Sequence, residues 1–299
     1  MIEKLEMFIA LAREEHFGRA AAACGVAQPS LSAAIKQLEE QLGVMLVWRG
    51  SRYQGLTPEG ARVLEWARQI VGDARAMRDE MRAVHEGLAG KLRLAVIPTA
   101  LGLAAELTAR FAQAHPNVRF TVLSRTSLEV QAMIDNLEVD AGLTYLSPDA
   151  APRMLQVPLF DERYVLVCAP DGPLADRDTV KWADLDGLPM ALLTPDMQNR
   201  RFVNDHLAAA GAHVDALVES NSQIMQLARV RAGGCAAIMP QALAQMLALG
   251  MGLRVVPIRG GNARHGVGLV APVRDPQTPV LAALLAEAAR LAQHERGQK

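Results

Sequence analysis

Hydrophobic and polar positions repeat along this chain with two different periods, and the change falls near residue 90. Before that point apolar residues recur every three or four positions, which is the period of α-helices with one buried face. After it, short apolar runs of strand length alternate with helical stretches, which is typical of an α/β fold. The pattern predicts a helical amino-terminal part followed by an α/β part.

Two short helices joined by a glycine turn are predicted within residues 17–42. Residues 19–24 are rich in alanine and favour a helix, and Gly25 stands where a left-handed residue would end it. Pro29 suits the first turn of the next helix. That helix has an apolar stripe of residues spaced by threes and fours: Leu31, Ile35, Leu38 and Leu42. Such a pair is the helix-turn-helix with which many proteins enter the major groove of DNA.

A different face of the second helix carries short polar side chains. Gln28, Ser32 and Lys36 are spaced four residues apart, and the remaining candidates on this face are Pro29, Ser30 and Ala33. Short polar groups at the start of an exposed helix can reach base edges, and a lysine can reach a phosphate. On an isolated helix these residues would be an ordinary solvated face. The paired helix and the hairpin that follows favour DNA contact instead.

A small hairpin, or wing, is predicted over residues 46–57. Gly50 and Gly55 bracket a turn between two short apolar runs, as a hairpin requires. The candidate contacts of this wing to the DNA backbone are Arg49, Arg52 and Tyr53. An ion pair of Arg49 with Glu39 or Glu40 that serves only the fold is the alternative.

Residues 1–60 resemble the winged helix-turn-helix of the LysR-type transcriptional regulators. The residues that carry the resemblance are Phe8, Phe17, Ala20, Ala21, Gln28, Pro29, Ser32, Ile35, Leu38, Glu39, Leu42, Gly43, Leu46, Arg49, Leu56, Thr57 and Gly60. The family usually has a serine or threonine cap where this chain has Ala27, and the lost hydrogen bond costs about 1 kcal/mol. Val47 and Trp48 also stand where the family favours phenylalanine after the wing leucine.

The charge of this segment is unusual for a DNA-binding domain. Residues 1–60 hold six lysines and arginines against seven glutamates, a net charge of −1, and the formal net charge of the whole chain is also −1. A basic balance is the usual footprint of DNA binding. We therefore expect modest non-specific affinity, and specific binding that needs a dimer on two half-sites.

A long helix is predicted from Pro58 to about Glu86, with Thr57 as its cap. Its mostly apolar residues form a heptad-like seam: Leu64, Ala67, Val71, Ala74, Met77 or Arg78, Met81, Val84 and Leu88. About thirty residues at 1.5 Å each make a rod of about 45 Å, which is too long to bury its seam on a small winged domain. A second copy of the chain is the expected partner. Packing on the chain's own carboxy-terminal part is the alternative.

Strands and helices alternate beyond the glycines at 87 and 90. Strands are predicted at 91–97, 119–123, 141–144, 154–160, 163–169, 189–193, 217–219, 236–239, 253–257 and 267–271, and helices at 99–114, 127–136, 201–210, 222–232, 242–249 and 279–293. The resemblance implies two Rossmann-like lobes similar to periplasmic binding proteins, joined by two crossing strands near residues 161–162 and 266–267.

Three domains are expected from these boundaries. Residues 1–60 form the winged helix-turn-helix, residues 61–90 the linker and dimerisation helix with its hinge, and residues 91–299 the effector-binding domain. Within the last, lobe one would comprise 91–161 and 267–299, and lobe two 162–266.

Candidate effector-binding residues follow the strands of the α/β part. Ligands of open α/β sheets bind past the carboxyl ends of the strands, where helix N-termini offer free N–H groups. The candidates there are Pro98, Thr99, Ala100, Thr126, Ser127, Thr144, Thr194, Arg200, Asn221 and Ser222. Hydroxyls, helix N-termini and one arginine suit a small anion such as an organic carboxylate. Each hydroxyl alone is equally explained as a plain N-cap, but together they favour a ligand site.

The sequence has no pattern that supports redox, metal-binding or catalytic chemistry. Cys24, Cys168 and Cys235 form no C-x-x-C pair and are interpreted as reduced, buried thiols. A peroxide-sensing pair would need two exposed cysteines close together in one lobe. The seven histidines show no metal-ligand spacing, and the phosphate-loop and nucleophile motifs are absent from the sequence. We expect neither a metal nor a cofactor.

The sequence is interpreted as a non-enzymatic transcriptional regulator, a homodimer or dimer of dimers that binds an interrupted palindrome in double-stranded DNA and responds to a small effector. No apolar run approaches the ~20 residues of a membrane span, and the first residues lack a signal-peptide core, so a cytoplasmic location is expected. The resemblance leaves room for a contact with RNA polymerase. The alternatives are a two-lobed α/β enzyme with a regulatory winged domain, and a constitutive DNA-architectural protein.

Overall fold

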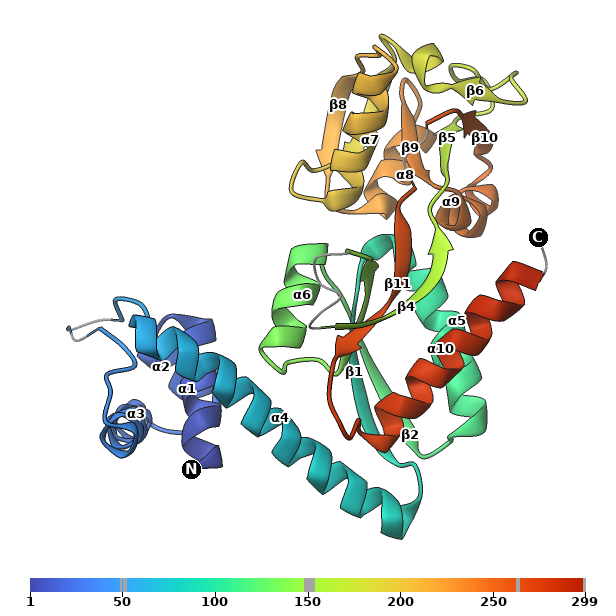
Figure 1. Ribbon diagram of the computed structural model, residues 1–299. Helices are drawn as coiled ribbons and strands as arrows, with labels where there is room; N and C mark the ends of the chain where they lie inside the picture. The colour runs from blue at the N-terminus through green and yellow to red at the C-terminus, as the bar shows by residue number, and fades with distance from the viewer. Residues whose placement is uncertain (49, 51–52, 148–153, 262–263, 298–299) are drawn as a thin grey trace.

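A winged helical domain, a long helix and two α/β lobes follow one another along the chain (Figure 1). The computed structural model describes residues 1–48, 50, 53–147, 154–261 and 264–297. The winged domain contains α1 (Ile2–Glu14), α2 (Phe17–Ala23) and α3 (Gln28–Leu42), and the long helix is α4 (Pro58–Glu86). None of the described helices combines the length and the apolar character needed to cross a bilayer.

The turn between α2 and α3 forms as the sequence predicts. Gly25 adopts a φ of +67°, in the left-handed region that favours glycine. Leu31, Ile35 and Leu38 are buried in the core of the winged domain. Leu42 is 40% exposed, so the predicted inward stripe is wrong at its last position. The reason is that α3 ends at Leu42 and Gly43 turns the chain away from that core.

The wing is held against the helices by backbone contacts. Val47 pairs with Leu56 in an antiparallel bridge, and Glu39 Oε1 accepts the backbone N–H groups of Leu46 and Val47 at 2.8 and 3.3 Å. At Gly60 a Cβ atom would lie 2.0 Å from the Leu46 carbonyl oxygen, so only glycine allows this approach. Glu39 is therefore occupied by the wing backbone.

Lobe one is a mixed sheet with three α-helices and one short 3-10 turn. Its strands are β1 (Gly90–Val96), β2 (Val118–Ser124), β3 (Ala141–Tyr145), β4 (Met154–Asp161) and β11 (Gly266–Pro272), and its helices are η1 (Pro98–Ala100), α5 (Leu101–Ala114), α6 (Ser127–Asp135) and α10 (Pro279–Gly297). The order in the sheet is β2-β1-β3-β11-β4, with β11 antiparallel to both neighbours. Apolar residues of the sheet and helices form one core.

Lobe two is a six-stranded sheet with helices on both faces. Its strands are β5 (Tyr164–Cys168), β6 (Val180–Lys181), β7 (Pro189–Leu193), β8 (Asp215–Ser220), β9 (Ala236–Pro240) and β10 (Arg254–Arg259). Its helices are η3 (Trp182–Leu185), α7 (Gln198–Ala209), α8 (Gln223–Arg231), α9 (Gln241–Leu247) and η4 (Leu249–Met251). The sheet order is β6-β10-β5-β9-β7-β8. The strand β6 and the short turns η3 and η4 are absent from the sequence-based prediction, because such short segments leave no periodic pattern.

The two lobes are joined where β4 passes into β5 and where β11 returns. Gly266 lies opposite Asp161 in the antiparallel pair of β11 and β4, and Figure 1 shows these strands running side by side toward lobe two. Next to that pair, the Glu162 N–H donates to the His265 carbonyl at 3.0 Å. The crossing therefore lies at Asp161–Glu162 and near Gly266.

The inner face of α4 is covered by its own chain. Leu64, Ala67 and Val71 are buried in the core of the winged domain, where α1 packs along α4. The expectation that a second copy covers these three residues is wrong. Lobe one also contacts α4, since Arg75 donates to the Leu137 carbonyl at 3.0 Å and Arg274 donates to the Gly72 carbonyl at 3.0 Å. Part of the alternative, packing on the chain's own carboxy-terminal part, is thus realised.

Candidate DNA interface and inter-lobe cavity

The start of α3 presents an open polar face. All six candidates on this helix are exposed: Gln28, Pro29, Ser30, Ser32, Ala33 and Lys36. Lys36 makes only a long i,i+4 ion pair with Glu40, with 3.9 Å between Nζ and Oε1. Ala27 caps the helix without a side-chain hydrogen bond, as expected. This face is therefore free to contact a duplex.

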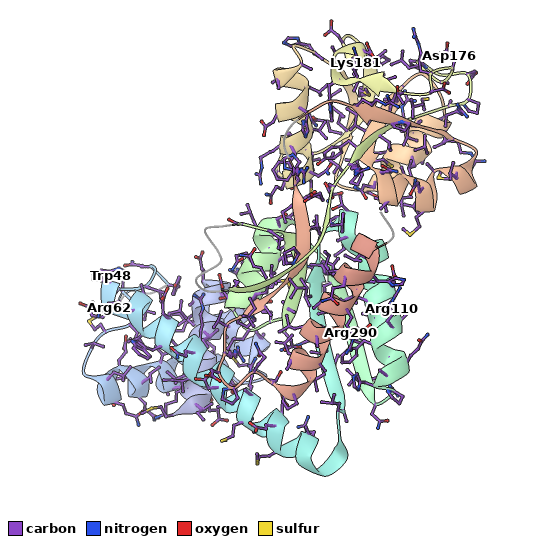
Figure 2. All side chains as sticks on the ribbon, turned by 45° about the vertical axis from the view of Figure 1, so that its right-hand side comes forward. Trp48, Arg62, Arg110, Asp176, Lys181 and Arg290 are labelled. Atoms are coloured by element: carbon purple, nitrogen blue, oxygen red, sulfur yellow. The ribbon has the colours of Figure 1, made fainter. Side chains whose placement is uncertain are left out.

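The described part of the wing offers fewer exposed candidate DNA contacts than the sequence predicts. Tyr53 is half-buried and packs against the core of the winged domain. Burial, and secondly the Glu15 carboxylate, raise the pKa of its phenol. Arg49 and Arg52 lie outside the described residues, and so does the alternative ion pair of Arg49. Figure 2 shows Trp48 and Arg62 at the outer end of the winged domain, and both side chains are exposed although neither is among the DNA contacts predicted from sequence.

Several acids of the winged domain are used inside the fold. Glu14 lies 2.7 Å from Arg13 and 3.8 Å from Arg19, measured between the charged atoms. Glu6 pairs with Arg75 of α4 at 3.3 Å, and Glu39 accepts two wing N–H groups. These contacts account for much of the acidic charge that the composition shows, and they involve none of the six candidates on α3.

A cavity of about 390 Å³ lies between the two lobes, hereafter the inter-lobe cavity. Its walls come from η1, the first turns of α5, the end of β4 with the lobe crossing, and α9, and include Thr99, Leu103, Phe160, Glu162, Gln241 and Met246. Thr99 is the predicted effector-binding residue that lines it. The other nine candidates are not among its described lining residues.

The remaining hydroxyl candidates divide into two kinds. Thr126 caps α6 in a capping box with Glu129, and Ser222 caps α8 by accepting the Met225 N–H at 3.4 Å, so both already have structural roles. Thr144 and Thr194 instead have buried hydroxyl oxygens without a hydrogen-bond partner among the described residues. Pro98, Ala100, Ser127 and Asn221 stand at the expected element junctions.

Arg200 is not a free cation. Its guanidinium donates to the Leu193 carbonyl and to Glu219 Oε1, the latter at 2.7 Å, and its side chain is only 11% exposed. That Arg200 meets an anionic effector stays a prediction, and this pairing counts against it. Glu219 reaches Arg200 because β8 lies beside β7, and α7, which carries Arg200, follows β7 in the chain.

Sequence reasoning missed the buried Glu162 at the lobe crossing. Glu162 is only 6% exposed, and its Oε2 accepts hydrogen bonds from Tyr145 at 2.9 Å, Tyr164 at 3.0 Å and Asn199 at 3.2 Å. Burial raises the pKa of this carboxyl, while hydrogen bonds lower it. Burial, followed by the nearby carboxylate, raises the pKa of both tyrosines. The signal that was available is an acid at the predicted crossing, between two strand-forming runs.

Aromatic and imidazole rings form a layer beside Glu162. Phe202 stacks on His265 with ring centroids 3.6 Å apart, and Trp182 stacks on His206 at 4.7 Å. The Nε2 atoms of the two histidines are 3.2 Å apart. Burial lowers the pKa of both imidazoles, and for His265 the neighbouring His206 adds to this. The layer packs helix α7 of lobe two against the crossing.

The cysteines are not arranged for thiol chemistry. Cys168 and Cys235 are buried in different apolar clusters on opposite faces of the lobe-two sheet. Burial raises the pKa of all three thiols and favours their unreactive form. Within the described ranges, no three His, Cys, Asp or Glu side chains are grouped to hold a metal ion.

A helix-turn-helix with an open polar face, a long helix and two lobes around a cavity together define a DNA-binding regulator with an effector-binding domain. The family model described as bacterial regulatory helix-turn-helix protein, lysR family, matches residues 2–61. The model described as LysR substrate binding domain matches residues 85–293. The chain therefore belongs to the LysR family of transcriptional regulators, which confirms the resemblance and the fold class predicted from sequence.

Sequence similarity to known proteins supports this assignment. The chain is 29% identical over 271 residues to the DNA-binding transcriptional dual regulator OxyR of Escherichia coli (strain K12), a match that covers 90% of this chain and 88% of that protein. It is 37% identical over 203 residues to the SDS degradation transcriptional activation protein of a Pseudomonas species, covering 64% and 63% of the two chains. These relatives are transcriptional regulators by name.

Solved structures show the same fold. A full-length OxyR variant from Pseudomonas aeruginosa matches with a TM-score of 0.74 at 24% identity, covering 98% of this chain and 99% of that chain. Full-length CbnR complexed with its target DNA matches with a TM-score of 0.60 at 24% identity, over 98% and 99% of the two chains.

Proposed function

We propose that this protein binds a specific interrupted palindrome as a homodimer or dimer of dimers, and that a small molecule in the inter-lobe cavity modulates this binding. The observation that carries the proposal is the open polar face of α3 on a LysR-family chain. The domains would be residues 1–60, 61–90 and 91–299, with lobe one at 91–161 and 267–299 and lobe two at 162–266. Such a regulator would act in the cytoplasm, and contact with RNA polymerase remains a prediction.

The test is selection of duplexes from a random pool, followed by electrophoretic mobility shifts at moderate salt. Ser32→Ala and Gln28→Ala are expected to weaken the selected duplex by about 1–3 kcal/mol each while leaving random DNA unaffected, because base contacts specify and phosphate contacts do not. Equal losses on both duplexes would contradict base reading by α3. Failure to select any duplex would favour the enzyme alternative.

The dimer would form through an exposed apolar stripe on α4. Trp66, Ile70, Met77 and Met81 are 63%, 41%, 60% and 53% exposed, and they are spaced by four, seven and four residues. At about 100° per residue, these positions fall within about 60° of one another around the helix. An apolar stripe that leaves its own chain uncovered supports association with a second copy.

The effector is proposed to be a small molecule rather than peroxide acting on a thiol. The E. coli relative of strain O6:H1 is named a hydrogen peroxide-inducible genes activator. In this chain Cys168 and Cys235 lie 0% and 1% exposed on opposite faces of one sheet, so they cannot meet without rearranging lobe two. The sequence-based hypothesis of a small organic anion stays a prediction, and the pairing of Arg200 with Glu219 weakens it.

A further inference from the structure

The inter-lobe cavity has a buried carboxylate in its wall that lacks a cationic partner. All the hydrogen bonds that Glu162 accepts converge on Oε2. Its other oxygen, Oε1, is buried and has no hydrogen-bond partner among the described residues. Lysine and arginine form no ion pair with Glu162 within those residues. A buried carboxylate in this state retains an unmet demand for a hydrogen-bond donor, which is strongest for a positively charged one.

The other charges of the cavity make Glu162 distinct. The described lining residues include three acids, Glu106, Asp161 and Glu162, and one basic residue, Arg163. Two of the acids are already paired, Glu106 with Arg110 at 2.7 Å and Asp161 with Arg264 at 3.7 Å. Glu162 is thus the acid of this wall that makes no ion pair among the described residues.

A second buried group points to the same place. Thr99 is 7% exposed and its Oγ1 makes no hydrogen bond of normal geometry among the described residues, although its hydroxyl lies close enough to Glu162 to lower the pKa of that carboxyl. Thr99 stands in η1, just before α5, whereas Glu162 stands at the lobe crossing. The Glu162 carboxyl and the Thr99 hydroxyl, which can donate to that carboxyl and accept from a ligand, therefore both belong to the wall of the cavity, and Leu103, Phe160 and Met246 supply apolar lining.

We propose that the inter-lobe cavity binds a small protonated amine, with its ammonium group received by Glu162 Oε1 and Thr99 Oγ1 and its apolar part among Leu103, Phe160 and Met246. This inference rests on the proposed function, because it names the ligand class of the same cavity. Since Glu162 lies at the crossing of the two lobes, an ammonium bound there contacts the point about which the lobes would move. It differs from the small organic anion of the sequence-based hypothesis, and the test below includes both ligand classes.

The test measures thermal stabilisation of the full chain by two matched series. The first series is benzylamine, benzyl alcohol and benzoate, and the second is 1,4-diaminobutane, 1,4-butanediol and succinate. In at least one series the amine is expected to bind roughly tenfold more tightly than the alcohol, because charge-assisted hydrogen bonds are about twice as strong as neutral ones. The carboxylates are expected to leave the melting temperature unchanged.

Glu162→Gln is expected to abolish the preference for the amine, because it keeps the shape of the side chain and removes its charge. Glu106→Gln is the matched control, since it removes an already paired acid from the same cavity, and it is expected to keep the preference. Circular dichroism of both variants checks their folding. Amines that bind no better than their alcohols, or that bind Glu162→Gln as well as the wild type, would overturn the assignment.

DNA binding by the same samples separates the two proposals. If the selected duplex still binds while every amine fails, the ligand class is wrong and the DNA-binding function stands. If no duplex is bound specifically, the proposed function itself fails, whatever the amines do.

Discussion

Glu162 owes its position to neighbours that the chain brings from three different segments. Tyr145 ends β3, Tyr164 begins β5 and Asn199 lies in the first turn of α7, and all three donate to one carboxylate oxygen. Hydrogen bonds from neutral donors can hold a buried acid, but they do not remove the cost of burying its charge. The buried charge of Glu162 therefore lowers the free energy of unfolding, and it does so at the place where the proposed ligand binds.

The pH dependence of stability follows from the raised pKa of Glu162. The folded chain holds its proton more tightly than the unfolded chain, so this group contributes stability at low pH that is lost as the pH rises from the unfolded value, near 4.5, through the folded pKa. Glu162→Gln removes this loss. Urea unfolding is expected to find the variant more stable than the wild type at pH 7.5, with a smaller difference at pH 4.5. A difference that is constant with pH would contradict a raised pKa.

The missing cap of α3 is a second prediction at the scale of single residues. Ala27→Ser is expected to raise the free energy of unfolding of the winged domain by about 1 kcal/mol, because a hydroxyl can accept a first-turn N–H that alanine leaves unbonded. Ala33→Ser is the control, since the same change inside the helix is expected to cost about 0.5 kcal/mol. Thermal unfolding measures both. Equal effects would show that the first-turn donors are already satisfied.

At the scale of elements, α4 has two apolar faces with different partners. One face, with Leu64, Ala67 and Val71, is buried against its own winged domain. The other, with Trp66 and Met77 among its exposed residues, lies open to a second copy. Helical periodicity alone does not separate these two faces, because the apolar residues of both faces repeat by threes and fours along the same helix.

The exposed stripe on α4 predicts which substitution will weaken dimerisation. Met77→Glu is expected to weaken dimerisation by roughly 2 kcal/mol, about thirtyfold, because it places a charge in the centre of the apolar contact. Light scattering after gel filtration over a concentration series measures this. Leu249→Glu, an equally exposed apolar residue in lobe two, is the control and is expected to leave the dimer intact. A Met77→Glu chain that stays dimeric would place the interface elsewhere.

At the scale of the whole molecule, lobe one is anchored in the winged domain. The residues after α6 reach across to it: Arg68 donates to Asn136 at 2.7 Å, and Leu137 is 9% exposed within the apolar core of the winged domain. Leu137 has a φ of +58°, in the left-handed region that is costly for leucine, so packing must stabilise it. This contact is a direct physical link between the sensor and the DNA-binding domain.

Leu137→Ala tests that link. It is expected to lower the free energy of unfolding of the winged domain by about 2–5 kcal/mol, as for other buried leucines cut to alanine. It is also expected to weaken the effect of an effector on DNA binding. Leu128→Ala, at a 69% exposed position of α6, is the control and should change neither quantity. Unfolding and mobility shifts measured with and without ligand decide the outcome, and an unchanged ligand response would show that coupling takes another route.

Patterns local in sequence predicted much of the fold. The glycine turn at Gly25, the cap of α4 by Thr57 and the crossing near Asp161 each depend on a few consecutive residues, and the structure shows them in place. The site was predicted less well. Thr99 lines the inter-lobe cavity, but Arg200 of α7 is paired with Glu219 of β8, a contact between distant segments that no local pattern contains.

The sequence by itself determined the class of the protein, because spacing, turn residues and family motifs are written in short stretches of chain. The tertiary structure alone decided which groups face the cavity and which faces remain open. Glu162 meets Tyr145 and Asn199 only after β3, the crossing and α7 come together, and α4 loses one apolar face only when α1 packs on it. Contacts between distant segments depend on the whole packing, and they set both the charge of the cavity and the surface left for a partner.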